Sequence, residues 1–399
     1  MVRTTGCADL IARVSGWSTE PTYTRQVTED GASGGFQSIG QTHAETLVRT
    51  TLAPDRGTAS LLIHGPTGAG KGAFATDVIA LLMCEATDPG ARPCNECRSC
   101  RLARAGTHPD LVIGSPGAWQ EARSTGESTV AAARRWLADA SGAPISGTRR
   151  VVLVEQLERA GEDIQNVLLK ALEEPTPRHL YLLLSDEPSR LLPTIRSRVQ
   201  SVRIGPLPRG TLVALLMDLD RLPEEQALAL ARLSGGLAGR ARRFAQRPEW
   251  LDWRRTTQTE LLALLTRGWA DRMAAARELI EQASRLTPRS PTADVAPDEP
   301  EAVRVPASAQ RAAALAVTDA WIDLGRDLLV SAAGHPDQAA SRELFADLEQ
   351  TGRRIGAPAL TAVLGVLDTV RDGIESNANP RLALEAAMLT WPRVAVEQP

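Results

Sequence analysis

The sequence predicts an α/β protein whose first part is a doubly wound parallel sheet and whose remainder is helical. Up to about residue 205, short apolar runs that suit buried strands alternate with amphipathic helical patterns. This alternation is typical of a parallel sheet with helices on both faces. The first apolar run ends in a glycine-rich turn that opens a helix, and beyond residue 206 the apolar residues recur only at helical spacing. We expect the functional site at the carboxyl ends of the strands, because the loops there gather it.

The apolar pattern also places the individual strands and helices of the α/β part. Ser128 is a suitable N-cap for the helix that follows it, and the last of these helices stops before a pair of prolines, Pro175 and Pro177. The expected strands are 61–63, 111–113, 151–154, 180–184 and 202–204. The expected helices are 42–52, 72–84, 128–140 and 163–174.

Changes in composition divide the chain into five segments. Polar and small residues at the start predict a mobile extension, and a proline-rich acidic stretch predicts a linker. A helical domain appended to the α/β core by a linker suggests oligomerisation. The expected segments are the extension 1–35, the α/β core 36–205, a small helical lid domain 206–287, the linker 288–306 and a helical oligomerisation domain 307–399.

Overall composition is that of a globular protein with more than one domain. The chain has 399 residues, 43% of them hydrophobic and 23% charged, which is too long for one ordinary core. No apolar run reaches the roughly 18 residues of a membrane span, so we expect a cytoplasmic protein without membrane contact. The net charge of −3 argues against a strongly basic nucleic-acid binder. Only two of the 45 basic residues are lysines, Lys71 and Lys170, and each lies in a motif.

The first strand and its turn have the order and spacing of a phosphate-binding loop, or P-loop. Backbone N–H groups can wrap a polyphosphate where no side chains intrude, and a helix N-terminus adds partial positive charge. However, Gly72 stands where a Ser or Thr hydroxyl would hold magnesium. We expect a loop that can cradle phosphate but is poorly equipped for hydrolysis; a turn that binds nothing is the alternative. The residues that fit the P-loop pattern are Gly65, Gly68, Gly70 and Lys71.

A second ATPase position is degraded in the same sense. The strand expected at 151–154 ends in Glu155 and Gln156, where P-loop ATPases carry an aspartate for magnesium and a glutamate that polarises the attacking water. Glu155 is one methylene longer than aspartate, and the amide of Gln156 cannot act as a base. Two independent losses predict an ATPase architecture without turnover, so ATP with Mg²⁺ is not expected to react at this chain's own site.

Four cysteines cluster directly after the helix that follows the P-loop. Thiolates are the ligands that zinc prefers, and a structural zinc site binds four of them at about 2.3 Å. Nothing in the neighbouring sequence suggests an activated water, so we expect a structural zinc knuckle over residues 84–100; a set of free thiols is the alternative. The expected ligands are Cys84, Cys94, Cys97 and Cys100.

Several motifs together resemble one protein family. Besides the P-loop, the cysteines and the strand at 151–155, the matching stretches are 166–175, 192–198 and 379–385. They look like a subunit of a bacterial DNA polymerase III clamp loader, and are most similar to delta-prime, over roughly residues 36–395. The resemblance implies an AAA+ core and a collar domain through which five subunits, including gamma (tau) and delta, form an open ring. ATP bound at the gamma (tau) subunits powers this ring, which opens the sliding clamp and places it on primer-template DNA.

The resemblance also implies roles for three residues. Ser197 and Arg198 correspond to the serine and arginine of the family's "SRC" motif, whose arginine reaches into the ATP site of the neighbouring subunit. Such an arginine finger is a planar cation aimed at the γ-phosphate and supplied in trans. The third residue of the motif is usually cysteine and is Val199 here. Because that cysteine does no phosphate chemistry, the difference leaves the implied role of Arg198 intact. Arg240 lies where the family's second sensor places an arginine. An exposed salt bridge is the alternative reading of Arg198.

The sequence therefore predicts a delta-prime-type stator of the DNA polymerase III holoenzyme, a nucleotidyltransferase complex, with little or no catalytic activity of its own. A gamma/tau-type ATPase is the first alternative, although it needs the groups that Gly72 and Gln156 replace. A stand-alone P-loop ATPase in recombination or repair predicts hydrolysis by the isolated chain. A zinc-stabilised scaffold predicts salt-dependent DNA binding without a partner. No role follows for Lys170.

Overall fold

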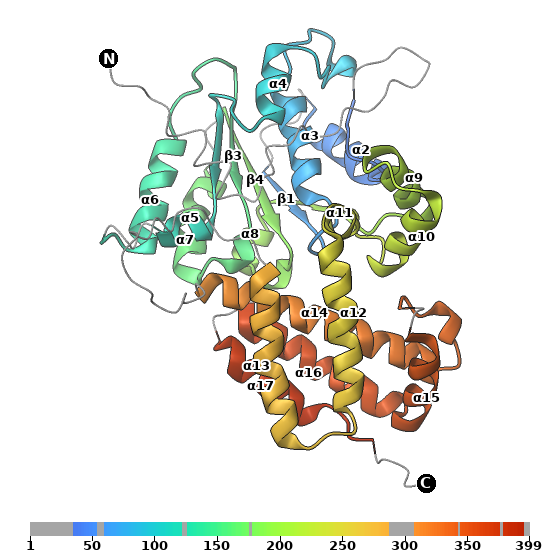
Figure 1. Cartoon of the computed structure of the whole chain (residues 1–399). Coiled ribbons are helices and arrows are strands. Elements are labelled where there is room, and N and C mark those ends of the chain that lie inside the picture. Colours follow the sequence, from blue (N-terminus) through green and yellow to red (C-terminus); the bar gives the residue numbers. More distant parts are fainter. Residues whose placement is uncertain are drawn as a thin grey trace, which may run out of the picture. The chain divides into compact units, whose positions relative to one another are not determined.

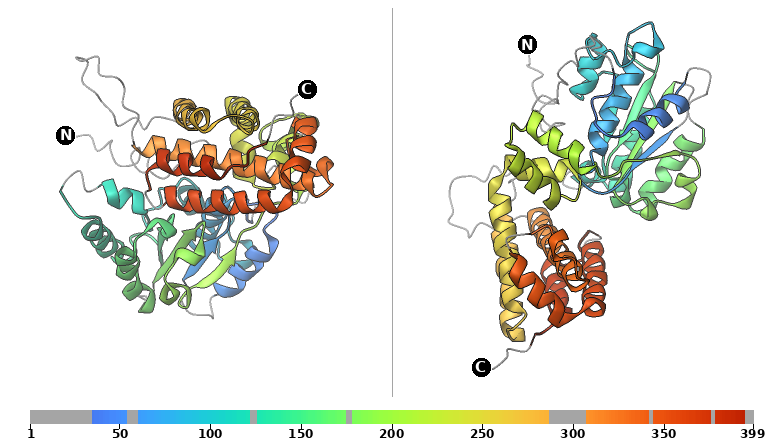
Figure 2. Two further views of the ribbon diagram at one scale, coloured as in Figure 1. Left: turned by 90° about the horizontal axis from the view of Figure 1, so that it is seen from below. Right: turned by 90° about the vertical axis from the view of Figure 1, so that its right-hand side faces the viewer.

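The structure is a computed structural model of the chain (Figures 1 and 2). It describes residues 35–53, 60–121, 126–174, 178–286, 307–341, 344–375 and 378–394. The expected N-terminal extension and the proline-rich linker lie outside these residues. The chain divides into two compact units, Met1–Arg243 and Phe244–Pro399. Among the described residues, no helix has the length and apolar content to cross a membrane.

The first unit is built on a five-stranded parallel sheet with the strand order β2-β3-β4-β1-β5. This confirms the α/β class predicted from the alternating pattern. In this order β1, the first strand in the sequence, lies between β4 and β5, and its Leu61 pairs with Leu182 and with Gln200. The strands are β1 (Leu61–His64), β2 (Leu111–Gly114), β3 (Arg150–Val154), β4 (His179–Ser185) and β5 (Gln200–Arg203).

Helices cover both faces of this sheet (Figure 1). Successive strand residues point to opposite faces, so Leu61 and Ile63 of β1 pack in one apolar cluster and Leu62 packs in another. The first cluster includes α2 (Thr42–Thr51), α3 (Lys71–Met83) and α4 (Arg98–Arg104). The second includes α5 (Pro116–Glu121), α6 (Thr129–Ala140), α7 (Glu162–Glu173) and α8 (Pro193–Arg196).

Short helical turns and caps connect these elements. Ser128 is the N-cap of α6, as predicted, because its hydroxyl accepts a hydrogen bond from the backbone N–H of Ala131 at 3.2 Å. Three further helices complete the unit, namely α9 (Arg209–Leu219), α10 (Glu224–Leu233) and α11 (Ala238–Gln246), whose last residues pass the unit boundary. The 3₁₀ turns of the described chain are η1 (Pro89–Ala91), η3 (Leu157–Arg159), η4 (Pro188–Arg190) and η5 (Pro336–Gln338).

The second unit is helical and has one core, in which Trp321 and Trp391 are fully enclosed. Buried Arg272 links its helix ends, since its guanidinium donates hydrogen bonds to the carbonyl oxygens of Leu264 at 2.9 Å and Trp391 at 2.6 Å. The helices are α12 (Pro248–Leu264), α13 (Trp269–Leu286), α14 (Ala307–Ala332), α15 (Phe345–Ile355), α16 (Ala357–Glu375) and α17 (Pro380–Thr390).

The unit boundary differs from the one expected at the proline-rich stretch. The segment 206–287, expected to be one lid domain, is divided between the two units at Arg243. The reason is packing: Leu261 of α12 and Leu279 of α13 enter the same apolar core as α14 and α17. The proline-rich stretch therefore connects two helices of a single core, which composition alone does not reveal.

Candidate functional site

The glycine-rich turn lies between β1 and α3, at the carboxyl edge of the sheet, and has the strand–turn–helix context that a P-loop requires. The φ angles of Gly65, Gly68 and Gly70 are +151°, +83° and +100°. A Cβ atom at Gly65 would lie 2.0 Å from the carbonyl oxygen of Ile204, and one at Gly68 would lie 3.2 Å from the backbone nitrogen of Arg240. Glycine at these two positions thus meets a need for both conformation and space.

Lys71 begins α3 and turns its side chain back over the loop. Its Nζ donates hydrogen bonds to the carbonyl oxygens of Gly65 at 2.8 Å and Pro66 at 3.0 Å, and it forms an ion pair with Asp186. An ammonium group has three N–H donors, so these three partners use all of them. The cation that would contact the phosphates of a nucleotide is therefore fully occupied by this chain's own oxygens.

Two acidic residues that sequence reasoning missed lie at the P-loop. Asp186 follows β4, and its second carboxylate oxygen accepts a hydrogen bond from the hydroxyl of Thr67 at 2.6 Å. The backbone N–H of Asp186 donates to Glu158 Oε2 at 3.2 Å. Burial and the neighbouring Asp186 carboxylate raise the pKa of Glu158. The only sign of these two residues in the sequence is that each acid follows a predicted strand closely. The sequence does not show that the two strands are neighbours, so it does not show that the two acids meet.

The positions at which the sequence predicts altered ATPase residues lie at the same edge of the sheet. A Cβ atom at Gly72 would meet no heavy atom within 4 Å, so the space for a hydroxyl side chain exists without the side chain. Glu155 is buried at the end of β3, where its backbone N–H donates to the carbonyl oxygen of Gly114 at 2.9 Å. Gln156 follows with a positive φ of 51°. These three positions thus carry glycine, glutamate and glutamine.

Arg240 lies beside the P-loop at the start of α11. The backbone N–H of Gly239 donates to the carbonyl oxygen of Gly68 at 2.8 Å, so the beginning of this helix is fixed to the loop. The structure therefore brings the expected second-sensor position next to the expected nucleotide site, although the two are 172 residues apart in the chain (240 − 68).

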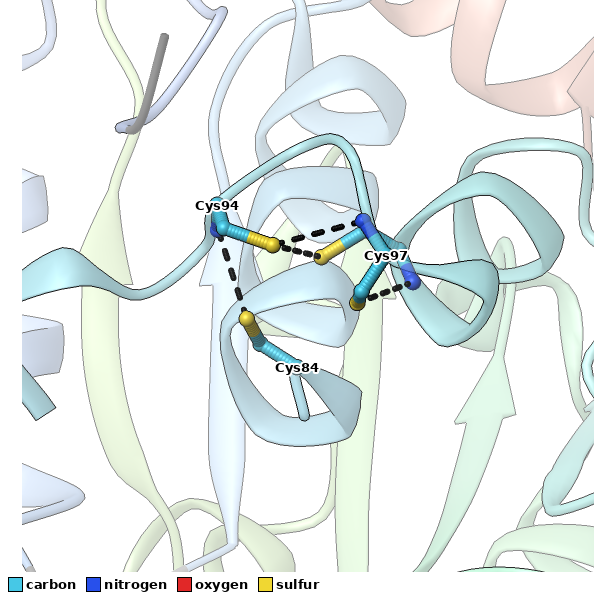
Figure 3. Close-up of side chains that lie close together, drawn as sticks. Cys84, Cys94 and Cys97 are labelled. Atoms are coloured by element: carbon cyan, nitrogen blue, oxygen red, sulfur yellow. Dashed lines mark hydrogen bonds between the residues drawn. The ribbon is translucent and has the colours of Figure 1, made fainter. Parts of the chain in front are cut away.

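The four clustered cysteines converge, as Figure 3 shows for three of them. Their Sγ atoms all lie within 4.8 Å of one another, and those of Cys94 and Cys100 are 4.0 Å apart. A tetrahedral zinc site with bonds of about 2.3 Å separates its sulfur atoms by about 3.8 Å. The cluster therefore has the ligand set and nearly the spacing that a metal ion such as zinc requires. The cysteines are Cys84, Cys94, Cys97 and Cys100.

Backbone N–H groups point at these sulfur atoms, which suits thiolates. The N–H of Cys94 donates to Cys84 Sγ at 3.3 Å, and that of Cys97 donates to Cys94 Sγ at 3.4 Å. Burial acts to raise the pKa of the Cys94 thiol, but the N–H groups of Cys97 and Glu96 bring that pKa down to about 7. Burial raises the pKa of Cys100. A cation among the sulfur atoms would favour the thiolate form of both.

The cysteine loop is joined to the P-loop helix by Asp77, which lies fully buried on α3. Its carboxylate accepts hydrogen bonds from the backbone N–H groups of Gln37 at 2.9 Å and Ser38 at 2.7 Å, and it pairs with Arg104 of α4 at 2.9 Å. The Nε of Arg104 in turn donates to the side-chain oxygen of Asn95 at 2.9 Å. The loop that carries the cysteines is thus positioned by the helix that begins at Lys71.

Ser197 and Arg198 lie away from the P-loop, at the opposite edge of the sheet. Arg198 precedes β5, whose Gln200 pairs with Leu61, the first residue of β1, whereas the P-loop follows the last. A four-residue strand is about 13 Å long. The Arg198 side chain is 37% exposed, and its guanidinium donates to the carbonyl oxygen of Thr194 at 2.9 Å and pairs with Glu173 at 2.8 Å. The hydroxyl of Ser197 donates to the same carbonyl at 3.0 Å.

Lys170, to which the sequence assigns no role, is exposed on α7. It lines a groove of about 670 Å³ between α6 and α7, together with Arg134 and Tyr181. The groove lies apart from the P-loop, and its mixed charges do not indicate one kind of ligand.

Comparisons with known proteins point to replication subunits. The family model described as "DNA polymerase III, delta subunit" matches residues 40–208. The DNA polymerase III subunit delta' of Pseudomonas aeruginosa is 40% identical over 178 residues, which are 44% of this chain and 52% of that protein. The subunit of the same name from Haemophilus influenzae is 30% identical over 246 residues, 57% of this chain and 68% of that protein.

The matches are partial in length and the structural likeness is weak. The chain spans about half the length of the delta' subunits of Pseudomonas aeruginosa, Escherichia coli and Bacillus subtilis that it matches. Among solved structures, a gamma subunit-related protein of Thermotoga maritima is 17% identical, with a TM-score of 0.38 over 87% of this chain and 97% of that one. With a score this low, the fold assignment rests on the strand order and helices described here.

Alanine substitutions at two glycines of the loop should have opposite effects. Gly65→Ala places a Cβ atom against the Ile204 carbonyl at a positive φ, so we expect a loss of about 2 kcal/mol or more of stability. Gly72→Ala enters open space on a helix, so we expect a gain of about 0.5–1 kcal/mol. Calorimetric melting of the two variants measures this difference, and equal destabilisation by both would contradict the loop geometry.

Proposed function

Because the chain belongs to the delta-prime family of DNA polymerase III subunits, we propose that it acts as a clamp-loader stator. In this role the chain turns over little or no ATP and donates Arg198 to the ATP site of a neighbouring subunit. Its proposed partners are the gamma/tau and delta subunits, the sliding clamp and primer-template DNA. A cytoplasmic location stays a prediction.

The absence of turnover is supported by the groups around the P-loop. Gly72 has no oxygen for magnesium, and Gln156 has no basic atom to polarise a water molecule. Lys71 has all three of its donors engaged by this chain. A gamma/tau-type ATPase, and equally a stand-alone ATPase, needs each of these positions in working form, and no observation favours either over the stator.

The role of Arg198 is supported chiefly by its position at the sheet edge opposite the P-loop. A guanidinium there is separated by the length of β1 from a phosphate bound in its own chain, so it can meet a phosphate only in trans. The ion pair with Glu173 is solvent-exposed on both sides, with exposures of 37% and 44%. Exposed pairs of this kind contribute at most about 1 kcal/mol, so Arg198 can exchange its partner for a phosphate at low cost.

A structural zinc ion is the finer proposal for the cysteine cluster. Cys84, Cys94, Cys97 and Cys100 would hold the ion as thiolates, and no open position for a substrate is needed. Bound there, the metal would join the end of α3 to the loop that leads into α4. It would thus stabilise the helix that carries Lys71 without taking part in any reaction.

Replacing Arg198 should remove hydrolysis at the neighbouring site. In an assembly with gamma/tau, delta, clamp and primed DNA, Arg198→Ala should slow ATP hydrolysis at the site it serves by about 10³-fold or more, because the charge on the transferring phosphate loses its planar cation. Steady-state hydrolysis measures the effect, and the isolated wild-type chain should be inert. The matched control is Arg196→Ala, which removes an exposed arginine two positions earlier and should change little. If the isolated chain hydrolyses ATP, and does so at the same rate with Arg198→Ala, the stator is contradicted.

Metal analysis tests the cysteine cluster. The purified chain should contain about one zinc ion per chain by mass spectrometry of the elements, and Cys97→Ser should lower both the zinc content and the melting temperature. Cys7→Ser is the matched control, because Cys7 is the remaining cysteine of the chain and is far from the other four in the sequence. A metal-free chain whose melting temperature is unaffected by Cys97→Ser would leave the thiols without a ligand role.

A further inference from the structure

We propose that Asp186 acts as an internal substitute for phosphate and holds the P-loop closed to nucleotide. This inference deepens the proposed function and rests on it in one respect, namely that the chain's own nucleotide site is silent. It assigns that silence to a specific contact, in addition to the missing catalytic groups.

The position of Asp186 follows from the pairing of two strands. In the parallel register of β1 and β4, His64 is the partner of Ser185. Gly65 directly follows β1 and Asp186 directly follows β4, so the aspartate lies beside the first glycine of the P-loop. A hydrogen bond from the N–H of Gly65 to the carbonyl oxygen of Ser185, at 3.2 Å, continues the pairing to this point. The sheet therefore delivers a carboxylate directly to the phosphate-binding turn.

Both oxygens of this carboxylate contact the P-loop. One pairs with the ammonium of Lys71, and the other accepts the hydroxyl hydrogen of Thr67 at 2.6 Å. A P-loop presents a lysine cation to the oxygens of a polyphosphate, and here an oxyanion of the chain itself already uses it. The remaining donors of Lys71 go to Gly65 and Pro66, so the cation has no donor left for a ligand.

The backbone of Asp186 is also held in place. The backbone N–H of Asp186 donates to buried Glu158 at 3.2 Å, and the Glu158 side chain lies in the interior with 8% exposure. An incoming triphosphate must break the Lys71 pair and place further negative charge beside two carboxyl groups. Like charges in a partly buried site repel more strongly than in water. The ion pair between Asp186 and Lys71 therefore opposes nucleotide binding in two ways. It occupies the lysine cation, and its carboxylate repels the triphosphate.

Removing the charge should uncover a latent anion site. Asp186→Asn keeps the size of the side chain and a carbonyl oxygen for Thr67, but it loses the charge that holds Lys71. The loop glycines and the N-terminus of the 13-residue helix α3 remain. We expect the affinity of the full chain for ATP to rise by at least about tenfold, as measured by calorimetric titration. The affinity should rise equally without Mg²⁺, because Gly72 offers the metal no ligand.

Three further variants make the result specific. Glu187→Gln removes the same charge one position along the chain, where the carboxylate pairs with Arg190 instead of the P-loop, and it should leave ATP affinity unchanged. Asp186→Asn combined with Lys71→Ala should lose the gain. Asp186→Ser serves as a second route to the uncharged loop if the asparagine variant does not fold, and melting curves of each variant establish that it is folded.

The inference is overturned if folded Asp186→Asn or Asp186→Ser binds ATP no more tightly than the wild-type chain, or if Glu187→Gln produces the same gain. These titrations use the chain alone, so they do not depend on the assembly. If Arg198→Ala does not slow ATP hydrolysis in the assembly, the stator is refuted and the closed loop is unaffected. Unchanged ATP affinity in the Asp186 variants would refute the closed loop and leave the stator standing.

Discussion

The parallel pairing of β1 with β4 on one side and β5 on the other determines where Asp186 and Arg198 lie relative to the P-loop. Pairing with β4 brings Asp186 next to Gly65, because the two strands end in register. Pairing with β5 places Arg198 at the start of β1, since that residue precedes β5 by two positions. One strand thus has a closed phosphate loop at its carboxyl end and an exposed guanidinium near its amino end.

The helix α3 extends this arrangement into the rest of the unit. It begins at Lys71 and its C-cap is Cys84, so the P-loop and the cysteine cluster occupy its two ends. Buried Asp77 ties the middle of the helix to the segment before α2 and, through Arg104, to the cysteine loop. A closed P-loop is compatible with this framework, because none of these contacts requires a nucleotide. In the proposed function, the chain keeps the architecture of an ATPase and supplies Arg198 to a neighbouring subunit.

Much of the fold is predictable from local patterns. The apolar runs at 151–154 and 180–184 coincide with β3 and β4, and Ser128 caps α6 as expected, since burial and capping leave short-range signals in sequence. The division of 206–287 between two units is not predictable in this way. It depends on which core Leu261 and Leu279 enter, and every helix of that region has an apolar face.

The candidate site is likewise predictable from the sequence only in part. The glycines of the P-loop and the four cysteines are contiguous in sequence, so their spacing alone identifies them. Asp186 and Glu158 follow different strands, and only the strand order β3-β4-β1 brings Asp186 to Lys71 and Glu158 to the backbone of Asp186. A motif search finds the groups that would bind phosphate, but it does not find the carboxylate that competes with phosphate for them.

A structure of the chain assembled with gamma/tau and delta subunits and a non-hydrolysable ATP analogue tests the central claim most directly. The account predicts that the Arg198 guanidinium lies about 3 Å from the γ-phosphate of nucleotide in a neighbouring subunit. It also predicts that Lys71 of this chain remains paired with Asp186. Nucleotide bound on Lys71, with Arg198 still paired to Glu173 and facing solvent, would contradict the account.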